Sequence, residues 1–234
     1  IRAQGAALTM GSDGRALGIS FRISLGGSTV PVLLPGVVGI APIRAALASA
    51  AVAQVLGVST LGLTQALVHV PFPAGRLRLL PGIKQTQLLD DTYNSSPEAV
   101  KVALATLCEL PLASESKRWA VLGDMLELGA ETRTLHKKNG QLVASSKVDY
   151  LVAIGELGHE VIGGAIEAGM DPDHAWHFAE ASEAGKFVQD RLAQGDVVLI
   201  KGSQGMRCER VTRELMAEPM RAREFLVRQY KPWV

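Results

Sequence analysis

The chain of 234 residues has few cysteines, few aromatic residues and almost no net charge. Its two cysteines, Cys108 and Cys208, lie far apart and neither belongs to a CxxC pair, which predicts reduced packing residues in a reducing compartment. A formal net charge of +1 provides no field to attract nucleic acid or an acidic membrane. With 5% aromatic residues, the chain also has few rings on which bases could stack. We therefore expect no nucleic-acid partner.

Long apolar runs and several catalytic motifs are missing too. The most apolar stretch, 45–58, is rich in alanine and shorter than the roughly 20 residues of a membrane span, so we expect a buried helix and no membrane insertion. The five histidines lack cysteine or carboxylate partners at ligand spacing, which predicts no metal site. Neither a GxSxG elbow nor a GxxxxGK(S/T) phosphate loop occurs.

The apolar pattern predicts two unlike halves. Residues 1–34 have the alternation and glycine turns of an antiparallel meander, followed by helices over 43–58 and 60–68. From residue 86 onward, strands alternate with helices, which is typical of βαβ units and a mainly parallel sheet. The expected strands are 86–89, 118–122, 150–154, 175–178 and 197–200, and the expected helices are 97–107, 131–145, 156–168, 182–193 and 207–216. The sequence thus predicts an α/β fold, with a Rossmann-like, mostly parallel sheet covered by helices on both faces.

Polar residues follow three of the predicted strands. These segments are Asp90 to Asn94, Gly123 to Gly129 with the carboxylate of Asp124, and Lys201-Gly202-Ser203. Ligands of open α/β sheets bind just beyond the carboxyl ends of the strands, so three such ends on one sheet edge favour a ligand site. The alternative is local: Ser95 or Ser96 caps the helix begun by Pro97, and the other two segments are turns.

Two further polar features lie outside these strand ends. Arg76 lies at the junction of the two halves, where a hinge would place it over a ligand, although a lone arginine in a linker is usually solvated. Basic and acidic residues are mixed near the C-terminus, which favours a solvated helix face there.

Several segments together resemble the ATP-dependent Mur ligases of peptidoglycan synthesis, and within them the MurF type. The segments are Pro73 to Leu77, Asp90 to Asn94, Val121 to Gly129, Lys201 to Ser203, and Met206 to Arg210. The resemblance is to the C-terminal portion of such a ligase. It implies that residues 1–80 are the end of a central ATP-binding domain without its phosphate loop, and that 81–234 are the Mur ligase C-terminal domain.

The resemblance also implies a reaction and roles for individual residues. ATP would phosphorylate the carboxylate of UDP-MurNAc-tripeptide, and the amine of D-alanyl-D-alanine would attack the acyl phosphate. Arg76 and Asp91 would contact ATP. The dipeptide would be bound by Tyr93, Asn94 and Ser203, with Lys201 or Asp124. The enzyme would be cytoplasmic. The sequence leaves its oligomeric state open, with a monomer favoured.

The chain departs from the family pattern in ways that favour a fragment of a longer ligase, inactive by itself, over a homologue that has lost its ATP site. The family's Mg²⁺ ligands lie upstream of Ile1, and Val37 to Ile40 stand where a His-Asn pair is usual. No catalytic residue is therefore assigned within the chain. Two alternatives stay open: a non-catalytic Rossmann-like module that binds a small amino acid or nucleotide, and a sister Mur ligase that adds another amino acid.

Overall fold

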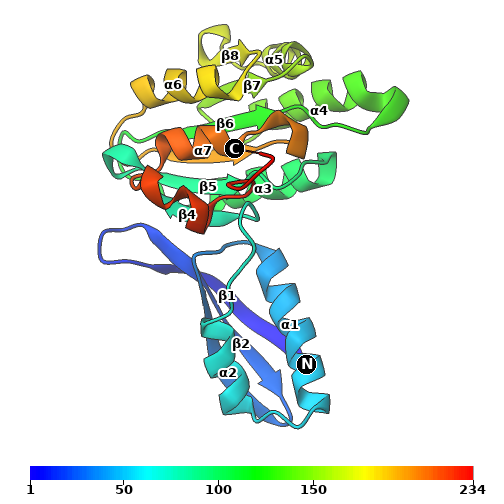
Figure 1. The fold of residues 1–234 in the computed structure, drawn as a ribbon, viewed down its shortest axis with the longest axis vertical. Helices are drawn as coiled ribbons and strands as arrows, with labels where there is room; N and C mark the ends of the chain where they lie inside the picture. The colour runs from blue at the N-terminus through cyan, green and yellow to red at the C-terminus, as the bar shows by residue number, and fades with distance from the viewer. Residues whose placement is uncertain (234) are drawn as a thin grey trace. The chain divides into compact units, whose positions relative to one another are not determined.

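The computed structural model describes residues 1–233 and contains two compact units, Ile1–Pro73 and Ala74–Val234. Each unit has its own sheet and its own apolar core. Figure 1 shows both units, coloured along the chain.

The first unit is a three-stranded antiparallel sheet packed against two helices. Its strands are β1 (Arg2–Met10), β2 (Ala16–Leu25) and β3 (Ser28–Pro35), in that order, and its helices are α1 (Ile40–Val55) and α2 (Thr60–Val68). Alternate residues of β2, among them Phe21 and Ile23, are buried in one cluster with Ile43 and Ala46 of α1. The expected antiparallel meander is confirmed. Helix α1 begins three residues earlier than expected, at Ile40.

The second unit is a six-stranded sheet with strand order β4-β5-β9-β6-β7-β8. Strand β4 (Arg78–Pro81) pairs antiparallel with β5, and the other pairs are parallel. The remaining strands are β5 (Gln87–Asp91), β6 (Arg118–Gly123), β7 (Tyr150–Ile154), β8 (Ala175–Phe178) and β9 (Val197–Lys201). The helices are α3 (Pro97–Glu109), α4 (Thr132–Ala144), α5 (Gly158–Glu167), α6 (Ala181–Arg191), α7 (Glu209–Leu215) and α8 (Ala222–Phe225). The predicted α/β fold with a mostly parallel sheet is confirmed.

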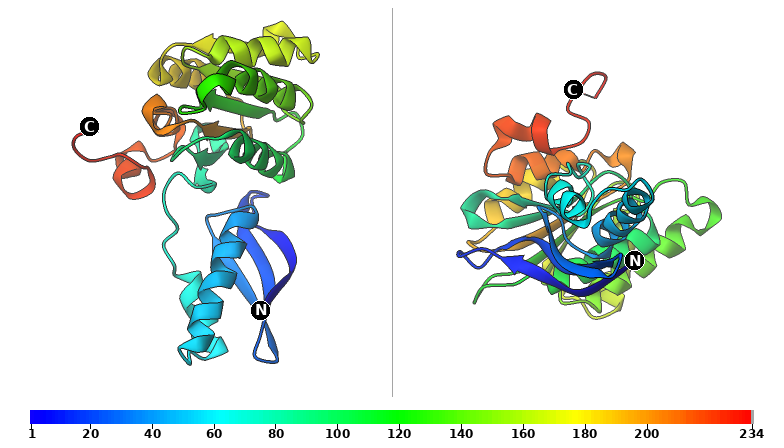
Figure 2. Two further views of the ribbon diagram at one scale, coloured as in Figure 1. Left: turned by 90° about the vertical axis from the view of Figure 1, so that its right-hand side faces the viewer. Right: turned by 90° about the horizontal axis from the view of Figure 1, so that it is seen from below.

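Helices cover both faces of this sheet, as Figure 2 shows. Helices α3, α4 and α5 lie on one face, while α6 and α7 pack on the other. Residues 151–154 of β7 and 197–200 of β9 are all buried, as expected for strands covered on both faces. Trp119 is buried in the core, where its indole N–H donates to Asp196 Oδ2 at 2.9 Å.

Helices α4 and α5 cross at a very short distance, which two glycines permit. A Cβ atom on Gly140 would overlap the carbonyl oxygen of Val161, and one on Gly164 would overlap the carbonyl oxygen of Lys137. Each glycine therefore faces the backbone of the opposite helix, and neither position has room for a larger residue.

Several boundaries differ from the expected ones. Asp90, Asp91 and Lys201 lie within strands β5 and β9, not beyond them. Helix α7 begins at Glu209, because residues Gln204–Met206 form a separate 3-10 turn. Both cysteines are free. Of residues 1–233, none belongs to a helix long and apolar enough to cross a membrane.

Candidate functional site

The three polar strand ends are neighbours in the sheet. Parallel pairing places Asp91 of β5 opposite Lys201 of β9, and Lys201 opposite Leu122 of β6. The segments after these strands therefore lie along one edge of the sheet, where open α/β folds bind ligands.

Lys201 and Asp91 form a buried ion pair at the centre of this edge. The Lys201 side chain is 2% exposed, and its Nζ lies 2.6 Å from Asp91 Oδ2. The same ammonium donates to the carbonyl oxygen of Asn94 at 2.8 Å. The other carboxylate oxygen of Asp91 accepts the N–H of Leu77 at 3.1 Å. Asp91 thus ties the end of β9 to the segment that leads into β4.

Arg76 and Tyr93 lie together beside this pair, with exposed side chains. The Arg76 guanidinium carbon lies 4.0 Å from the centre of the Tyr93 ring, a cation–π contact. The Tyr93 N–H donates to the carbonyl of Gly75 at 3.0 Å. Gly75 has φ +69°, and a Cβ there would lie 2.8 Å from the Tyr93 nitrogen, so this close approach requires glycine.

Asn94 is also exposed, and its side chain shapes the local turn. Its Oδ1 accepts the N–H of Ser95 at 2.8 Å, while Ser96 caps α3 by accepting the N–H of Ala99. The local role expected for Ser96 is therefore present. The Asn94 amide nitrogen is a donor that this contact does not use.

Asp124 is buried where the ends of β6 and β7 meet. Both of its carboxylate oxygens lie 3.2 Å from the N–H of Leu157, at the start of α5. Burial raises the pKa of Asp124, and the hydrogen bond from Leu157 partly offsets that rise. Gly155, with φ +111°, leaves the space that this carboxylate occupies. The carboxylate thus holds the turn between β7 and α5.

Ser203 joins the β9 segment to the β6 segment. Its Oγ accepts the N–H of Leu126 at 2.9 Å, and its own N–H donates to the carbonyl of Asp124 at 3.1 Å. Of the predicted site residues, Arg76, Asp91, Tyr93, Asn94 and Lys201 come together in one group. Asp124 and Ser203 form a second group, connected to the first through Gly202.

His136 points back to the strand ends and is buried. The Met125 N–H donates to His136 Nε2 at 2.9 Å, so Nε2 carries no proton. The ring proton therefore resides on Nδ1, which donates to the carbonyl of Thr132 at 2.7 Å. His136 thus fixes the loop after β6 through both of its ring nitrogens.

Asp90 is fully buried beside the ion pair. Its Oδ1 accepts the hydroxyl groups of Thr92 and Thr212, each at 2.9 Å. Among residues 1–233 no donor reaches its Oδ2. Burial raises the pKa of Asp90 to about 6, although the two threonine hydrogen bonds act in the opposite direction.

This raised pKa predicts a pH-dependent stability. The folded chain holds the Asp90 proton more tightly than the unfolded chain, so the resulting stability is complete below about pH 4 and is lost as pH rises through about 6. Asp90→Asn cannot ionise. Relative to that variant, the wild type is expected to lose about 3 kcal/mol of unfolding free energy across this window, from a shift of roughly two pKa units. Urea unfolding at several pH values measures the difference.

The matched control is Asp190→Asn, which changes an exposed carboxylate on α6. Its pH profile should follow the wild type. Parallel profiles for the wild type and Asp90→Asn would show that Asp90 titrates normally.

Sequence reasoning missed a second buried ion pair behind Tyr93. Glu209 is 0% exposed, and its Oε2 lies 2.8 Å from Arg228 Nη2. Its Oε1 accepts Arg207 Nε at 2.7 Å. Burial raises the pKa of Glu209, but the hydrogen bonds from Arg228 and Arg207 outweigh it, so the net pKa is lowered. The expected solvated face is therefore wrong for Glu209 and Arg228.

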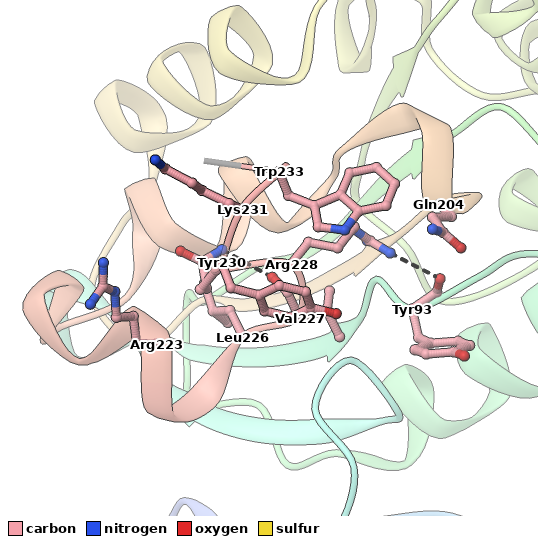
Figure 3. A pocket seen from close by; sticks show the side chains of 10 residues that line it. Tyr93, Gln204, Arg223, Leu226, Val227, Arg228, Tyr230, Lys231 and Trp233 are labelled. Carbon is pink, nitrogen blue, oxygen red and sulfur yellow. Dashed lines mark hydrogen bonds between the residues drawn. The ribbon is translucent and has the colours of Figure 1, made fainter.

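The C-terminal segment lines an open hollow of about 720 Å³ next to Tyr93, shown in Figure 3. Arg228 crosses it toward Tyr93, while Gln204 and Trp233 close the same side. Arg223 and Lys231 lie at the opposite end. Its lining comprises Tyr93, Gln204, Arg223, Leu226, Val227, Arg228, Gln229, Tyr230, Lys231 and Trp233.

Metal binding has no support from the side chains described. Within residues 1–233, no three His, Cys, Asp or Glu side chains are grouped closely enough to hold a metal ion.

Comparison with known proteins identifies the class of this fold. A family model described as "Mur ligase, glutamate ligase domain" matches residues 75–204, more than half of the chain. The chain therefore belongs to the Mur ligase family. The UDP-N-acetylmuramoyl-tripeptide–D-alanyl-D-alanine ligase of Bacillus subtilis is 30% identical over 175 residues, which cover 75% of this chain and 38% of that protein.

Solved structures agree with this assignment. MurF from Acinetobacter baumannii superposes with a TM-score of 0.76 at 25% identity, over 93% of this chain and 44% of that one. MurF ligase from Thermotoga maritima in complex with ADP shares the fold, with a TM-score of 0.69 at 22% identity, over 91% and 45%. The chain thus spans less than half the length of these relatives, and the predicted resemblance to the C-terminal portion of a MurF-type ligase is confirmed.

Proposed function

We propose that this chain is part of a cytoplasmic ATP-dependent ligase that adds D-alanyl-D-alanine to UDP-MurNAc-tripeptide in peptidoglycan precursor synthesis. The observation that carries the proposal is the 30% identity over 175 residues to the Bacillus subtilis ligase of that name. The exposed pair of Tyr93 and Asn94, next to Arg76 at the carboxyl edge of the sheet, supports it as the ligand-facing surface.

Arg76 and Asp91 fit the nucleotide side of the proposed reaction. ATP supplies the phosphoryl group that activates the acceptor carboxylate. The exposed guanidinium of Arg76 offers several donors for phosphate oxygens. A carboxylate has about four lone-pair positions, and the two hydrogen bonds to Asp91 leave acceptor capacity for a ribose hydroxyl. The Thermotoga maritima relative was solved with ADP, which agrees with this chemistry.

Tyr93 and Asn94 fit the dipeptide side, because both residues are exposed and carry hydrogen-bonding side chains. Lys201, Ser203 and Asp124 belong to the same proposed site, but they are buried and hydrogen-bonded within the chain. We propose that they act by holding the surface on which the dipeptide lies. Mg²⁺ and the phosphate loop belong to the rest of the proposed ligase, so the isolated chain is expected not to ligate.

Calorimetry tests the proposal against its alternatives. The chain is titrated with D-alanyl-D-alanine, meso-diaminopimelate and D-glutamate under the same conditions. Preferential binding of the dipeptide supports the proposal, preference for either amino acid favours a sister ligase, and binding of none of them contradicts the proposed substrate site.

Replacing Asn94 with alanine is expected to weaken dipeptide binding about tenfold. The estimate corresponds to one lost hydrogen bond of about 1–1.5 kcal/mol. Calorimetry of the variant measures the change. Gln141→Ala, which removes another exposed amide on α4, is the matched control and should bind like the wild type. Equal affinities for all three proteins would remove Asn94 from the proposed site.

A further inference from the structure

The loop that follows β5 is held by two buried cations instead of by a neighbouring strand. Strand β5 ends at Asp91. Arg228 donates to the carbonyl oxygens of the next two residues, Thr92 and Tyr93, and Lys201 donates to that of Asn94. Three successive carbonyl groups thus accept hydrogen bonds from charged donors, which are stronger than those from neutral donors.

Each of these cations has its own buried carboxylate. Lys201 pairs with Asp91 at 2.6 Å, and Arg228 pairs with Glu209 at 2.8 Å. Arg228 is 6% exposed, and Glu209 also binds Arg207. Breaking such a pair by removing one partner leaves a charge without compensation. Substituting either partner of a pair is therefore expected to disturb the contacts of the other partner as well.

The loop is fixed on its other side as well. The Tyr93 N–H donates to the carbonyl of Gly75, so both polar backbone groups of Tyr93 are bound. The Tyr93 side chain is nevertheless 44% exposed, and Figure 3 shows it directed away from Arg228. The backbone is thus held by buried groups, while residues Tyr93 and Asn94 are themselves exposed.

We propose that Arg228, with Glu209 as its counter-charge, is a positioning residue for the ligand-binding loop Thr92–Asn94, acting in parallel with Lys201. The two ion pairs hold the loop in its binding conformation before a ligand arrives. Binding then requires less ordering of the backbone, which increases affinity. The inference rests on the proposed function for the identity of the ligand, whereas the loop's immobilisation stands on the contacts alone.

An apolar core would stabilise the same region without two ion pairs. Replacing buried ion pairs by packed apolar residues is often neutral or stabilising, so the pairs are poorly explained by stability alone. Apolar side chains have no donors for the carbonyl groups of residues 92–94, and these groups lie at the point where the sheet no longer provides partners. The charged side chains therefore fix the backbone conformation of the loop, through the hydrogen bonds that they donate to its carbonyl groups.

The test compares Arg228→Met, Arg228→Lys and wild-type chain by two measurements. The first is hydrogen exchange of the Tyr93 and Ser95 amides, and the second is calorimetric affinity for D-alanyl-D-alanine. We expect Arg228→Met to exchange these amides at least tenfold faster and to bind about tenfold more weakly, with unchanged exchange in β6 and β7. Arg228→Lys should restore part of both effects, because it keeps a charged donor.

The matched control is Arg221→Met in the same C-terminal region. It removes exposed ion pairs to Glu218 and Glu224 that do not involve the loop, so neither measurement should change. Wild-type exchange and affinity in a folded Arg228→Met chain would overturn the inference. If the wild type fails to bind the dipeptide, the proposed function is contradicted, and the exchange measurement alone still decides the inference.

Glu209→Gln provides a second route if Arg228→Met does not fold. The substitution keeps the volume and one acceptor but removes the counter-charge of Arg228. Faster exchange of the Tyr93 and Ser95 amides is expected, together with weaker dipeptide binding. Unchanged exchange in this variant would show that the loop is held independently of the Glu209–Arg228 pair.

Discussion

Replacing Lys201 with methionine is expected to lower the free energy of unfolding of the second unit by about 3–5 kcal/mol. The substitution leaves the Asp91 carboxylate without its counter-ion and the carbonyl of Asn94 without its charged donor. For a unit of this size, the corresponding fall in melting temperature is about 10 °C. Thermal unfolding followed by circular dichroism measures it.

Two further variants isolate the cause. The double substitution Asp91→Asn with Lys201→Met removes both charges and should recover most of the lost stability. Lys101→Met changes an exposed lysine on α3 and should melt like the wild type. A melting temperature for Lys201→Met within about 2 °C of the wild type would mean that the pair contributes little, as exposed pairs do.

Gly140→Ala is expected to destabilise the second unit by about 3 kcal/mol, the upper end of the usual cost of overpacking. The added methyl group meets the backbone carbonyl of Val161, which cannot rotate away as a flexible side chain can. Helices α4 and α5 must separate to accept it, and buried contacts along both helices are then lost. Chemical denaturation measures the change.

Gly163→Ala is the matched control, on the same pair of helices. Apart from its chain neighbours and the backbone of α5 itself, no heavy atom in the described part of the chain lies within 4 Å of a Cβ at Gly163. Alanine favours a helix over glycine, so this variant should be about 0.5–1 kcal/mol more stable than the wild type. Equal effects for the two variants would indicate that the crossing is loosely packed and that glycine is not required at residue 140.

The alternation of strands and helices was predictable because its signal is local. Val197 to Ile200, for example, form a short apolar, β-branched run that is buried on both faces, and such a run is visible without knowledge of its neighbours. The ends of β5 and β9 were not predictable in the same way. The local sequence around each of Asp91 and Lys201 predicts a loop residue. Their ion pair joins positions that lie 110 residues apart in the sequence.

The second buried pair was missed for a related reason. Glu209 and Arg228 stand among other acidic and basic residues, a pattern that is typical of a solvated surface. Their burial depends on the C-terminal segment returning to the end of β5, where Arg228 reaches the carbonyl groups of Thr92 and Tyr93. The hydrophobic periodicity of the sequence does not indicate that the C-terminal segment packs against the end of β5.

The position of β9 in the sheet also determines when the second unit can fold during synthesis. The strand is the last of the six in sequence, yet it lies between β5 and β6. Until residue 201 has left the ribosome, β5 and β6 cannot be joined, and both expose unpaired edges. Contacts between such distant segments form slowly. The surface that carries Tyr93 and Asn94 is thus completed only after β9 and the segment that contains Arg228 have been made.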